Sequence, residues 1–556
     1  MPAPANAAFF YHPDSVDVSK PKLMGRHAAG EGFLAGFVRA SGVDRFYCYA
    51  ESEAHAQDFS RRVAALGGAG RPVVWLRRGE LGGLAQAGCL SLPHPSMAGP
   101  AWLRRHGEAR AFSLSSVFHT TASASTMEAI ADYAVAPLQP WDAAVCPSRA
   151  VKGTVERILA TWADYLERRV GGRARAPLML PVIPLGVDAA GLAAAAGSAA
   201  DRTRLRGELG IAPDAVAVLF VGRLSYHAKA NPFPLYVGMA EAARRTGKPL
   251  HLVMAGWFAN DSIERTFRTA ARALCPGVPV SFVDGRRPEL RHAIWSVADV
   301  FASLSDNVQE TFGLTPIEAM AAGLPVVASD WDGYRETVRH GVDGFAVPTL
   351  MPPPGDGLDL AFRHAAEADT YDRYIGGASQ SVAVDVPATA DALAALAADE
   401  GLRRRMGEAG RARAAAEFDW AVIVRRYQEL WTELAARRAR EPEIAPRGPA
   451  DPPNPRADDP YALFAHYATT TLGPRHVVGL VPGADVAALG EGAGIVAFIP
   501  YLLASGEAVG RMMAAIKAGP VSVEALLAPH PPAEHARLRR TIAWLYKAGL
   551  VRIAAG

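Results

Sequence analysis

The chain has 556 residues, too many for one hydrophobic core, and this length predicts two large domains with room for a smaller third. Apolar residues make up 50% of the sequence, which supports well-filled cores. The 58 basic and 56 acidic residues leave a net charge of +2, so the overall charge favours neither nucleic acid nor an anionic membrane as a partner.

Cysteine usage and the apolar runs favour a soluble protein of the cytoplasm. The opening residues 1–16 lack the basic start and apolar centre of a secretory signal. The longest apolar run, 492–506, is short for a membrane span and contains Pro500. The four cysteines lack the spacing of a zinc or redox motif, and we expect buried thiols in a reducing compartment: Cys48, Cys89, Cys146 and Cys275.

The first part of the chain alternates short apolar runs with longer amphipathic segments. Up to about residue 185 we expect strands at 7–12, 45–50 and 72–78, separated by helical segments that include 30–42 and 55–68. The same alternation starts again near residue 214, with strands expected at 214–224, 249–256, 278–284, 299–305, 324–330 and 343–348. Near-continuous apolar strands joined by helices predict parallel sheets that are covered on both faces.

This pattern predicts an α/β protein with two doubly wound, Rossmann-like domains, residues 1–185 and 186–440. Ligands of such sheets bind beyond the carboxyl ends of the strands, so the cleft between the domains is the expected site. Residues 180–188 predict a connecting strand that leads into a turn at Gly186. A long helical stretch, 402–440, follows the second sheet, with apolar spacing at Val422, Ile423, Tyr427, Leu430 and Leu434.

The Pro-rich residues 441–460 predict a linker or a strap, and residues 461–556 an accessory domain, mainly helical. Within it, residues 521–556 predict a short helix, a turn, a second helix and a strand, a pattern that resembles a winged helix. Trp544 and Leu545 fit a core position, and we favour a solvated basic face on a docking or acceptor-recognition domain over a surface that binds a partner or nucleic acid. The basic residues of that face are His535, Arg537, Arg539, Arg540 and Lys547.

A surface patch at residues 102–105, Trp-Leu-Arg-Arg, offers a small interfacial site for peripheral membrane association. The segment is short, and ordinary surface exposure of these residues is the preferred interpretation.

Residues 305–333 contain two glutamates eight positions apart, Glu310 and Glu318. Thr315 and Glu318 fit a capping box, with Pro316 at the first helical position, so Glu318 has a structural interpretation. Glu310 has none, because it lies in a loop that follows an apolar strand, where binding residues are common.

The same loop predicts a binding site for a sugar nucleotide. Backbone N–H groups of residues 311–314 lie at the positive end of the following helix, which suits an anion such as a diphosphate. The two carboxylates suit hydroxyl groups on either side of that diphosphate. After the first strand of the second domain, Gly222 allows a close turn, and Arg223 and Lys229 supply cations for the phosphates.

Taken in order, these elements resemble glycosyltransferase family 4, whose members are retaining enzymes of GT-B fold. The resemblance rests on Gly222, Arg223 and Lys229, on Glu310 to Glu318, and on the sequences EAMAAGLPVVAS (318–329) and DGYRETVRHGVDGFAV (332–347). Residues 182–188 are similar to the family's interdomain strand, and 418–431 to its closing helix. The resemblance covers residues 180–435 strongly and the first domain weakly.

The resemblance implies a role for each matching residue. Arg223 and Lys229 would bind the donor diphosphate, Glu318 the ribose and Glu310 the donor sugar. Residues 113–123, SLSSVFHTTAS, are similar to the strand that ends in the family's active-site histidine, which makes His119 the match. The expected catalytic residues are Glu310, His119, Arg223 and Lys229; the expected donor-binding residues are Glu318, Gly222, Thr311, Phe312, Gly313, Leu314, Gly25 and Arg26. The last two stand in for a glycine-rich turn whose usual Gly-Gly pair is missing here.

The implied reaction moves a sugar from a nucleotide diphosphate to an acceptor hydroxyl with retention, by front-face attack in which the cations stabilise the leaving diphosphate. We expect no cofactor and no metal, because the chain has no Asp-x-Asp element of metal-dependent sugar-nucleotide enzymes. The acceptor, a carbohydrate, a lipid-linked molecule or a protein, stays open. Domain closure would use hinge points at Gly186 and near Trp420.

Two alternatives remain at this point. Phosphorylases and sugar-nucleotide epimerases share the GT-B architecture, although no lysine resembles a pyridoxal-phosphate site. The chain could also be a partner- or nucleic-acid-binding protein that acts through its C-terminal domain, with the sugar-nucleotide site secondary.

Overall fold

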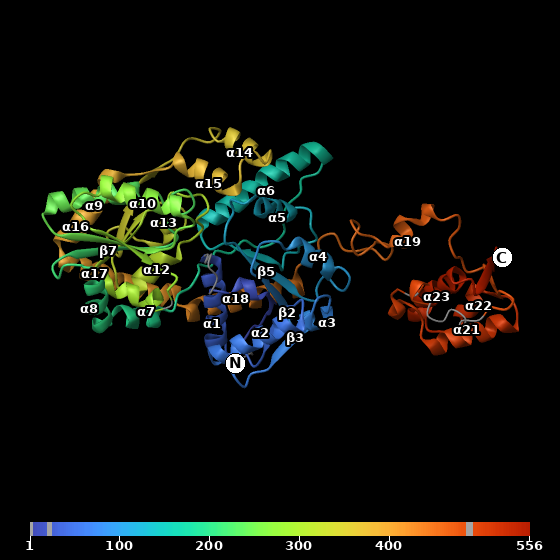
Figure 1. Cartoon of the computed structure of the whole chain (residues 1–556). Helices are drawn as coiled ribbons and strands as arrows, with labels where there is room; N and C mark the ends of the chain where they lie inside the picture. The colour runs from blue at the N-terminus through green and yellow to red at the C-terminus, as the bar shows by residue number, and fades with distance from the viewer. Residues whose placement is uncertain (1–3, 19–24, 288, 485–492, 497, 556) are drawn as a thin grey trace. The chain divides into compact units, whose positions relative to one another are not determined.

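A computed structural model describes residues 4–18, 25–287, 289–484, 493–496 and 498–555 (Figure 1). The chain divides into two compact units, residues 1–454 and 455–556. Among the described residues, the first unit contains two six-stranded sheets and a two-stranded one, and the second contains a small three-stranded sheet. The boundary between the units falls inside the Pro-rich segment 441–460.

The first domain is a six-stranded parallel sheet of order β3-β2-β1-β4-β5-β6. Its strands are β1 (Ala8–Tyr11), β2 (Phe46–Ala50), β3 (Val73–Arg77), β4 (Cys89–Leu92), β5 (Ser113–Val117) and β6 (Ala143–Val145). The helices are α1 (Gly25–Ala40), α2 (Glu53–Val63), α3 (Leu81–Ala87), α4 (Ala98–Arg104), α5 (Ala124–Asp132) and α6 (Arg149–Val170).

The second domain repeats this architecture with a parallel sheet of order β12-β11-β10-β7-β8-β9. Its strands are β7 (Val216–Val221), β8 (Leu250–Gly256), β9 (Val280–Asp284), β10 (Val300–Ser303), β11 (Val326–Ser329) and β12 (Gly344–Val347). The main helices are α7 (Ala189–Ala196), α8 (Ala199–Glu208), α9 (Phe233–Thr246), α10 (Asp261–Leu274), α11 (Leu290–Ala293), α12 (Leu314–Ala321), α13 (Tyr334–Thr337), α16 (Val386–Ala398) and α17 (Glu400–Arg413).

Two doubly wound Rossmann-like domains confirm the predicted fold class. The interior strands β2 and β8 are almost fully buried, because helices cover both faces of the sheets. This double covering explains why these strands read as continuous apolar runs rather than as alternating patterns.

The predicted strand at 180–188 is wrong. This segment makes only isolated bridges, from Met179 to Ala143, from Val182 to Cys146 and from Val187 to Asp419. Pro181 and Pro184 lack the N–H groups that a continuous ladder requires, so the segment runs beside β6 without becoming a strand.

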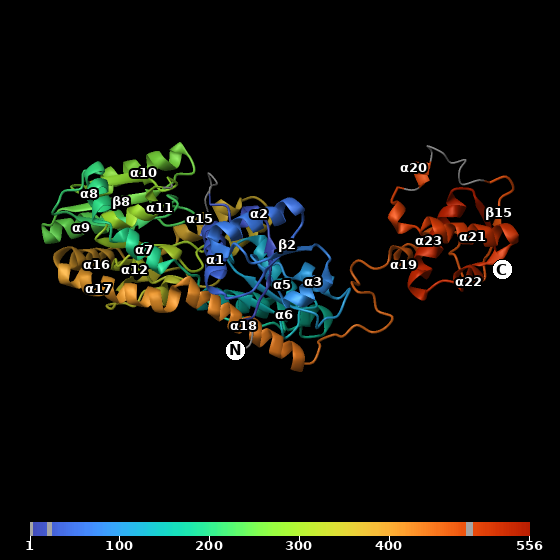
Figure 2. The same ribbon diagram turned by 90° about the horizontal axis from the view of Figure 1, so that it is seen from below.

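The predicted helical stretch 402–440 is two helices rather than one. Helix α17 runs into a wide turn at Ala414–Phe418, and α18 (Trp420–Arg440) begins after Asp419, whose side chain accepts from the N–H of Ala421. Figure 2 shows α18, in orange, leaving the second domain and running along the first. Its apolar side packs with α1 into the core of the first domain, so α18 fastens the two domains together.

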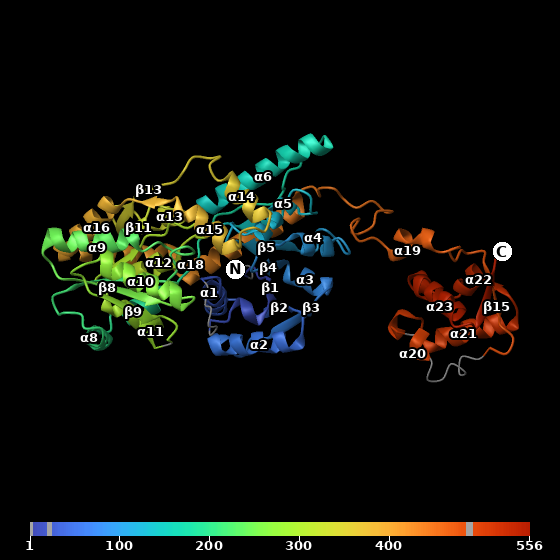
Figure 3. The ribbon, with the colours of Figure 1, turned by 45° about the horizontal axis from the view of Figure 1, so that its top comes forward.

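An insertion separates β12 from α16. It contains a short hairpin of β13 (Thr349–Leu350) and β14 (Ala383–Val384) and two helices, α14 (Leu358–Ala365) and α15 (Tyr371–Gln380). These helices, in yellow, lie at the junction of the two domains (Figure 3). There Ile375 packs with Ala122 of the first domain and Ala228 of the second.

The C-terminal unit has its own core. Strand β15 (Val477–Leu480) pairs antiparallel with β16 (Val521–Ser522) and β17 (Val551–Ala554). The helices are α19 (Pro460–Leu463), α20 (Ala493–Val496), α21 (Gly506–Ala518), α22 (Val523–Leu527) and α23 (His535–Lys547). The predicted order of helix, turn, helix and strand over 521–556 is confirmed, whereas a winged helix stays a prediction. On α23, Leu538, Ile542 and Leu545 face the core while Arg537 and Arg539 are exposed, which agrees with a solvated basic face.

At residues 102–105 the interfacial patch and the preferred ordinary surface exposure are both wrong for Arg104. Arg104 is 1% exposed, and its guanidinium makes a bidentate pair with Asp142 at 2.7 Å in both contacts. Asp142 also accepts from the backbone N–H of Leu114 and Gln139. The arginine is therefore a paired core residue, which a membrane surface could not reach.

Among the residues that the structure describes, no helix combines the length and apolarity that crossing a membrane would require. All four cysteines are free and buried. Burial raises the pKa of the Cys48, Cys146 and Cys275 thiols to about 12, which keeps them protonated and unreactive.

Candidate active site

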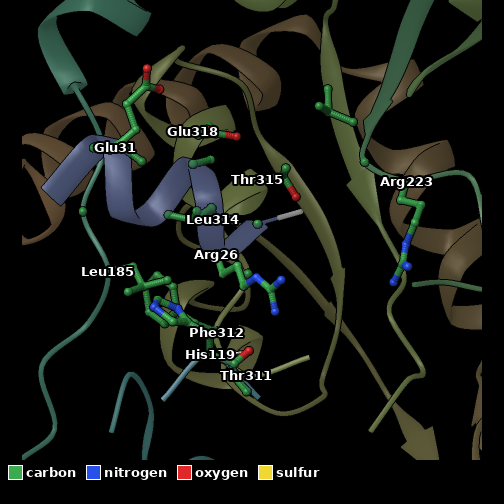
Figure 4. Close-up of a pocket in the computed structure, with 18 of the residues that line it drawn as sticks. Arg26, Glu31, His119, Leu185, Arg223, Thr311, Phe312, Leu314, Thr315 and Glu318 are labelled. Atoms are coloured by element: carbon green, nitrogen blue, oxygen red, sulfur yellow. Dashed lines mark hydrogen bonds between the residues drawn. The ribbon is translucent and has the colours of Figure 1, made fainter. Parts of the chain in front are cut away.

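A cleft of about 910 Å³ lies between the two domains, at the carboxyl ends of both sheets. Figure 4 shows side chains around it, with Arg26 and Glu31 on α1 and Glu318 on α12. The cleft brings together all of the residues predicted for catalysis and donor binding: Gly25, Arg26, His119, Gly222, Arg223, Lys229, Glu310, Thr311, Phe312, Gly313, Leu314 and Glu318.

Arg223 comes two residues after the end of β7 and is held from two sides. Its Nη2 donates to the carbonyl of Ala228 at 2.7 Å and to the side-chain oxygen of Gln309 at 2.9 Å. At Gly222 the backbone comes so close to β8 that a Cβ on Gly256 would lie 1.8 Å from the Gly222 carbonyl oxygen. The close approach of the two strand ends leaves the guanidinium at the edge of the cleft.

Lys229 and Glu310 form an ion pair inside the cleft, with side chains only 22% and 12% exposed. Burial alone would raise the pKa of Glu310, but the Lys229 ammonium and the backbone N–H of Thr311, at 3.3 Å, hold it below its ordinary value. Burial likewise disfavours the charged lysine, yet Glu310 raises its pKa. Both groups are therefore charged at neutral pH.

Helix α12 begins at Leu314, and Gly313 precedes it with φ +85°. A Cβ on Gly313 would lie 1.9 Å from the Tyr334 ring, so only glycine fits this position. No side chain caps the first turn, and the predicted capping box of Thr315 and Glu318 is wrong, because the helix begins one residue before Thr315. The first N–H groups of α12 therefore face the cleft without a side-chain acceptor.

The side chain of Phe312 does not line the cleft in the way its neighbours do. The residue as a whole is 2% exposed, and its ring packs against Phe418 with ring centroids 6.2 Å apart. The loop is thus anchored by an apolar side chain. The backbone contact to a ligand that the resemblance implies for Phe312 stays a prediction.

Glu318 lies one turn into α12, half-buried in the wall of the cleft. Burial raises its pKa to about 7, against the opposing effects of Arg291 and Lys229. A carboxyl group with this pKa changes charge in the physiological range. Its ability to accept hydrogen bonds from ligand hydroxyls therefore increases as it loses its proton.

His119 follows β5 by two residues and is half-buried. Its carbonyl accepts from the Thr311 hydroxyl at 3.4 Å, which joins the two domains beside the cleft. Burial, with smaller contributions from Arg26, His94 and His27, lowers the pKa of His119 to about 4. The imidazole is therefore neutral at pH 7 and can accept a proton or a hydrogen bond.

Gly25 and Arg26 are the first residues of α1, where they border the cleft from the first domain. Residues 19–24, which include most of the segment before Gly25 in the expected turn, lie outside the described residues. Arg26 Nε lies 3.4 Å from His27 Nε2.

Several residues that shape the cleft had no role in the sequence-based prediction. Gln309 links Arg223 to Tyr371, because its Nε2 donates to the Tyr371 hydroxyl at 2.9 Å. That hydroxyl lies 3.5 Å from Thr120 Oγ1 in the first domain. Gln309 could have been suspected from its place beside Glu310, whereas nothing in the local sequence marks Tyr371, which is 62 residues away.

A second missed contact spans the cleft. Arg291 Nη2 on α11 pairs with Glu31 Oε2 on α1 at 2.7 Å, and both residues line the cavity. Their separation of 260 residues leaves no local pattern from which the pair could be predicted.

Two further acids near the site carry strongly raised pKa values. Burial raises the pKa of Asp306 to about 7, although the N–H of Asn231 donates to it at 3.2 Å. Burial and then Glu310 raise the pKa of Asp332 to about 8. Asp332 also has φ +45°, an unusual backbone conformation for a residue other than glycine.

Within the described parts of the chain, no three His, Cys, Asp or Glu side chains are grouped closely enough to hold a metal ion. Metal independence nevertheless stays a prediction.

Part of the chain is similar to known proteins. Residues 201–350 match the family model described as glycosyl transferases group 1. The chain is 32% identical over 214 residues to D-inositol 3-phosphate glycosyltransferase of Geodermatophilus obscurus, covering 38% of this chain and 46% of that protein. It is 29% identical over 233 residues to alpha-maltose-1-phosphate synthase of Mycobacterium tuberculosis, covering 41% and 51%. The chain thus spans about half the length of the curated relatives it matches.

Solved structures with a related arrangement include Anabaena Alr3699/HepE in complex with UDP and glucose, with a TM-score of 0.47 and 18% identity over 77% of this chain and 100% of that one. Sucrose-phosphate synthase of Thermosynechococcus elongatus has a TM-score of 0.45 and 17% identity over 78% and 96%. The match over 201–350 covers strands β7 to β12 and the whole loop from Ser305 to Leu314. The similarity to glycosyl transferases group 1 is thus located in the second domain of this chain.

Proposed function

We propose that the protein is a retaining glycosyltransferase that moves a sugar from a nucleoside-diphosphate sugar to an acceptor hydroxyl. The observation that carries the proposal is the grouping of Arg223, Lys229, Glu310 and the start of α12 in one interdomain cleft. A cleft at the carboxyl ends of two Rossmann-like sheets, with fixed cations and free helix N–H groups, suits a diphosphate flanked by hydroxylated groups.

In the proposed donor complex, the diphosphate lies between Arg223 and the backbone at residues 312–314. The ribose donates hydrogen bonds to Glu318, and the sugar hydroxyls lie near Glu310. The ion pair of Lys229 and Glu310 supports this order, because it holds one cation for phosphate directly beside one carboxylate for hydroxyls.

The proposed reaction is a front-face displacement. The acceptor oxygen bonds to the anomeric carbon on the face that the diphosphate leaves, the bond from that carbon to the phosphate oxygen breaks, and the hydroxyl proton passes to the diphosphate. Arg223, Lys229 and the N–H groups of α12 stabilise the charge that develops on the leaving group. Glu310 is engaged by Lys229, which supports a role in orienting the sugar rather than as a covalent nucleophile.

A thermal-shift screen tests the donor assignment. We expect nucleoside diphosphates and their sugar conjugates to raise the melting temperature, because a ligand that binds only the folded state stabilises it. Arg223→Ala should weaken every diphosphate ligand alike, by about 1.5–3 kcal/mol for a lost charge-assisted contact. Unchanged affinity in this variant would contradict the phosphate clamp.

The requirement for an acceptor distinguishes a transferase from a sugar-nucleotide epimerase. A transferase releases the nucleotide rapidly only when an acceptor hydroxyl is present, whereas an epimerase needs no acceptor. Nucleotide release that does not respond to any hydroxyl acceptor would count against transfer.

A further inference from the structure

A second cavity, of about 350 Å³, lies in the first domain over the carboxyl end of β1. Most of its wall is apolar, and much of that is aromatic. The aromatic members come from β1, from helices α1 and α2 and from the crossing helix α18: Phe9, Phe10, Tyr11, Phe33, Phe59, Trp420 and Tyr427.

These rings pack on one another at the edge of the cavity. The ring of Phe33 lies 4.8 Å from that of Tyr427, 5.8 Å from Phe9 and 6.0 Å from Trp420, centroid to centroid. The wall is therefore a built aromatic surface rather than a gap between polar side chains.

Strand β1 is an interior strand, with β2 on one side and β4 on the other, and helices cover its sheet. Its flanking residues Ala8 and Tyr11 are buried, yet Phe9 and Phe10 are only half-buried. Both phenylalanines line the cavity, which explains why aromatic residues at the centre of a sheet keep accessible surface.

Polar side chains line two parts of the cavity. Some lie where it meets the interdomain cleft, and the others line the cavity alone: His12, Asp14, Ser15, His27, Ser91 and Ser116. Arg26, His94 and His119 line both spaces, and so do Leu185 and Trp420. His94 follows β4, and its buried Nδ1 has no hydrogen-bond partner in the described structure. The cavity thus has a mainly apolar wall and a polar mouth that opens beside the candidate catalytic histidine.

The predominance of aromatic rings in the wall favours one class of molecule. A sugar or other polyol would leave hydroxyl groups unpaired against these rings, which cannot replace the hydrogen bonds to water. An aromatic molecule is stabilised when its apolar surface leaves water and packs against the rings of the wall. A single hydroxyl of that molecule can then reach a histidine nitrogen at the mouth.

We propose that this cavity binds the apolar, aromatic body of an acceptor and directs its hydroxyl through the polar mouth at His94 and His119 into the cleft. The inference rests on the proposed function and names the class of its acceptor. The hydroxyl oxygen bonds to the anomeric carbon, the bond to the leaving diphosphate breaks, and the hydroxyl proton passes to that diphosphate. The products are an aryl glycoside and the nucleoside diphosphate.

The test uses 2-naphthol as the probe and the full chain, with binding measured by calorimetry and with UDP and GDP titrated separately. Ser91→Leu fills the cavity, because Ser91 lies on β4 in its wall and does not line the cleft. Val117→Phe fills it from β5 in case the first variant folds poorly. Ser60→Leu is the matched control, since Ser60 is exposed on α2 and lines neither space.

We expect 2-naphthol to bind the unmodified chain and Ser60→Leu equally. Ser91→Leu and Val117→Phe should weaken 2-naphthol binding at least tenfold. Their nucleotide affinity should stay within twofold of that of the unmodified chain. The assignment would be overturned if 2-naphthol did not bind the unmodified chain. It would also be overturned if Ser91→Leu and Val117→Phe melted like the unmodified chain and bound 2-naphthol as tightly. Loss of the naphthol site in the filled variants, in a protein that binds no nucleoside diphosphate, would support the apolar site and contradict the transferase.

Discussion

At the scale of single residues, the ion pair of Lys229 and Glu310 is the centre of the site. Both side chains are half-buried, and each stabilises the charged form of the other. A ligand phosphate must therefore compete with Glu310 for Lys229 or bind next to the intact pair.

Glu310→Ala separates orientation of the sugar from binding of the phosphate. We expect transfer to fall at least a hundredfold, while affinity for a nucleoside diphosphate stays the same or increases, because Lys229 loses its internal partner. Steady-state rates and calorimetry on the same preparation measure both quantities. Transfer that survives the substitution would show that Glu310 is misassigned.

Glu318 predicts a pH dependence of nucleotide binding. Its carboxylate form accepts hydrogen bonds from ribose hydroxyls, and burial holds its pKa near 7 in the free protein. Affinity should therefore rise as the pH increases from 6 to 8. The diphosphate itself also titrates, so Glu318→Gln is the control: the rise should be reduced by the share due to Glu318. Identical pH profiles for the two proteins would contradict the contact.

At the scale of elements, helix α15 has a role that its sequence does not reveal. Its first residue, Tyr371, supports Gln309, which in turn holds Arg223. The same hydroxyl reaches Thr120 beside His119, so the insertion touches both sides of the cleft. We infer that α15 positions the arginine in the assembled cleft.

Tyr371→Phe tests this positioning, because it removes one hydroxyl and keeps the ring. We expect a three- to tenfold loss of kcat/KM and a loss of unfolding free energy of about 1 kcal/mol, typical of one hydrogen bond. Tyr374→Phe, on the same helix, is the matched control, since the Tyr374 ring stacks on His364 at 4.6 Å. Equal effects of the two changes on kcat/KM would rule out a specific role for Tyr371.

At the scale of the whole molecule, burial of acids around the cleft makes stability depend on pH. The pKa values of Asp306 and Glu318 are raised to about 7, and that of Asp332 to about 8. Each group is protonated in the folded state at pH values where the unfolded chain is ionised. The stability this provides is complete below the ordinary pKa and is lost as the pH rises through the raised one. The lowered pKa values of His94, His119 and His251 act in the opposite sense, but only below about pH 6.5.

We therefore expect the free energy of unfolding to fall by about 2–3 kcal/mol between pH 6.5 and 8. Asp332→Asn should remove about half of this fall, and asparagine tolerates the positive φ of that position. Denaturant titrations at several pH values measure the effect. A stability that is flat or rising over this interval would contradict the raised pKa values.

Much of the fold could be predicted from the sequence, because a buried parallel strand requires an unbroken apolar run and each helix between strands has its own period. Strands β7 to β12 were predicted for this reason. The errors arose where a local pattern had two solutions. Arg104 lies in a segment whose composition is typical of a surface helix, but it is buried and paired with Asp142. Residues 180–188 have the apolar pattern of a strand but lack some of the N–H groups that a strand needs.

The site divides in the same way. Arg223, Lys229, Glu310 and the start of α12 follow strand ends, so the chain alone determined that they would meet at one edge of the second sheet. The tertiary structure alone decided what faces them: Tyr371, the pair of Glu31 and Arg291, and the aromatic cavity beside His119. These come from segments up to a few hundred residues apart, and their contacts depend on packing free energy between domains, which leaves no periodic trace in the sequence.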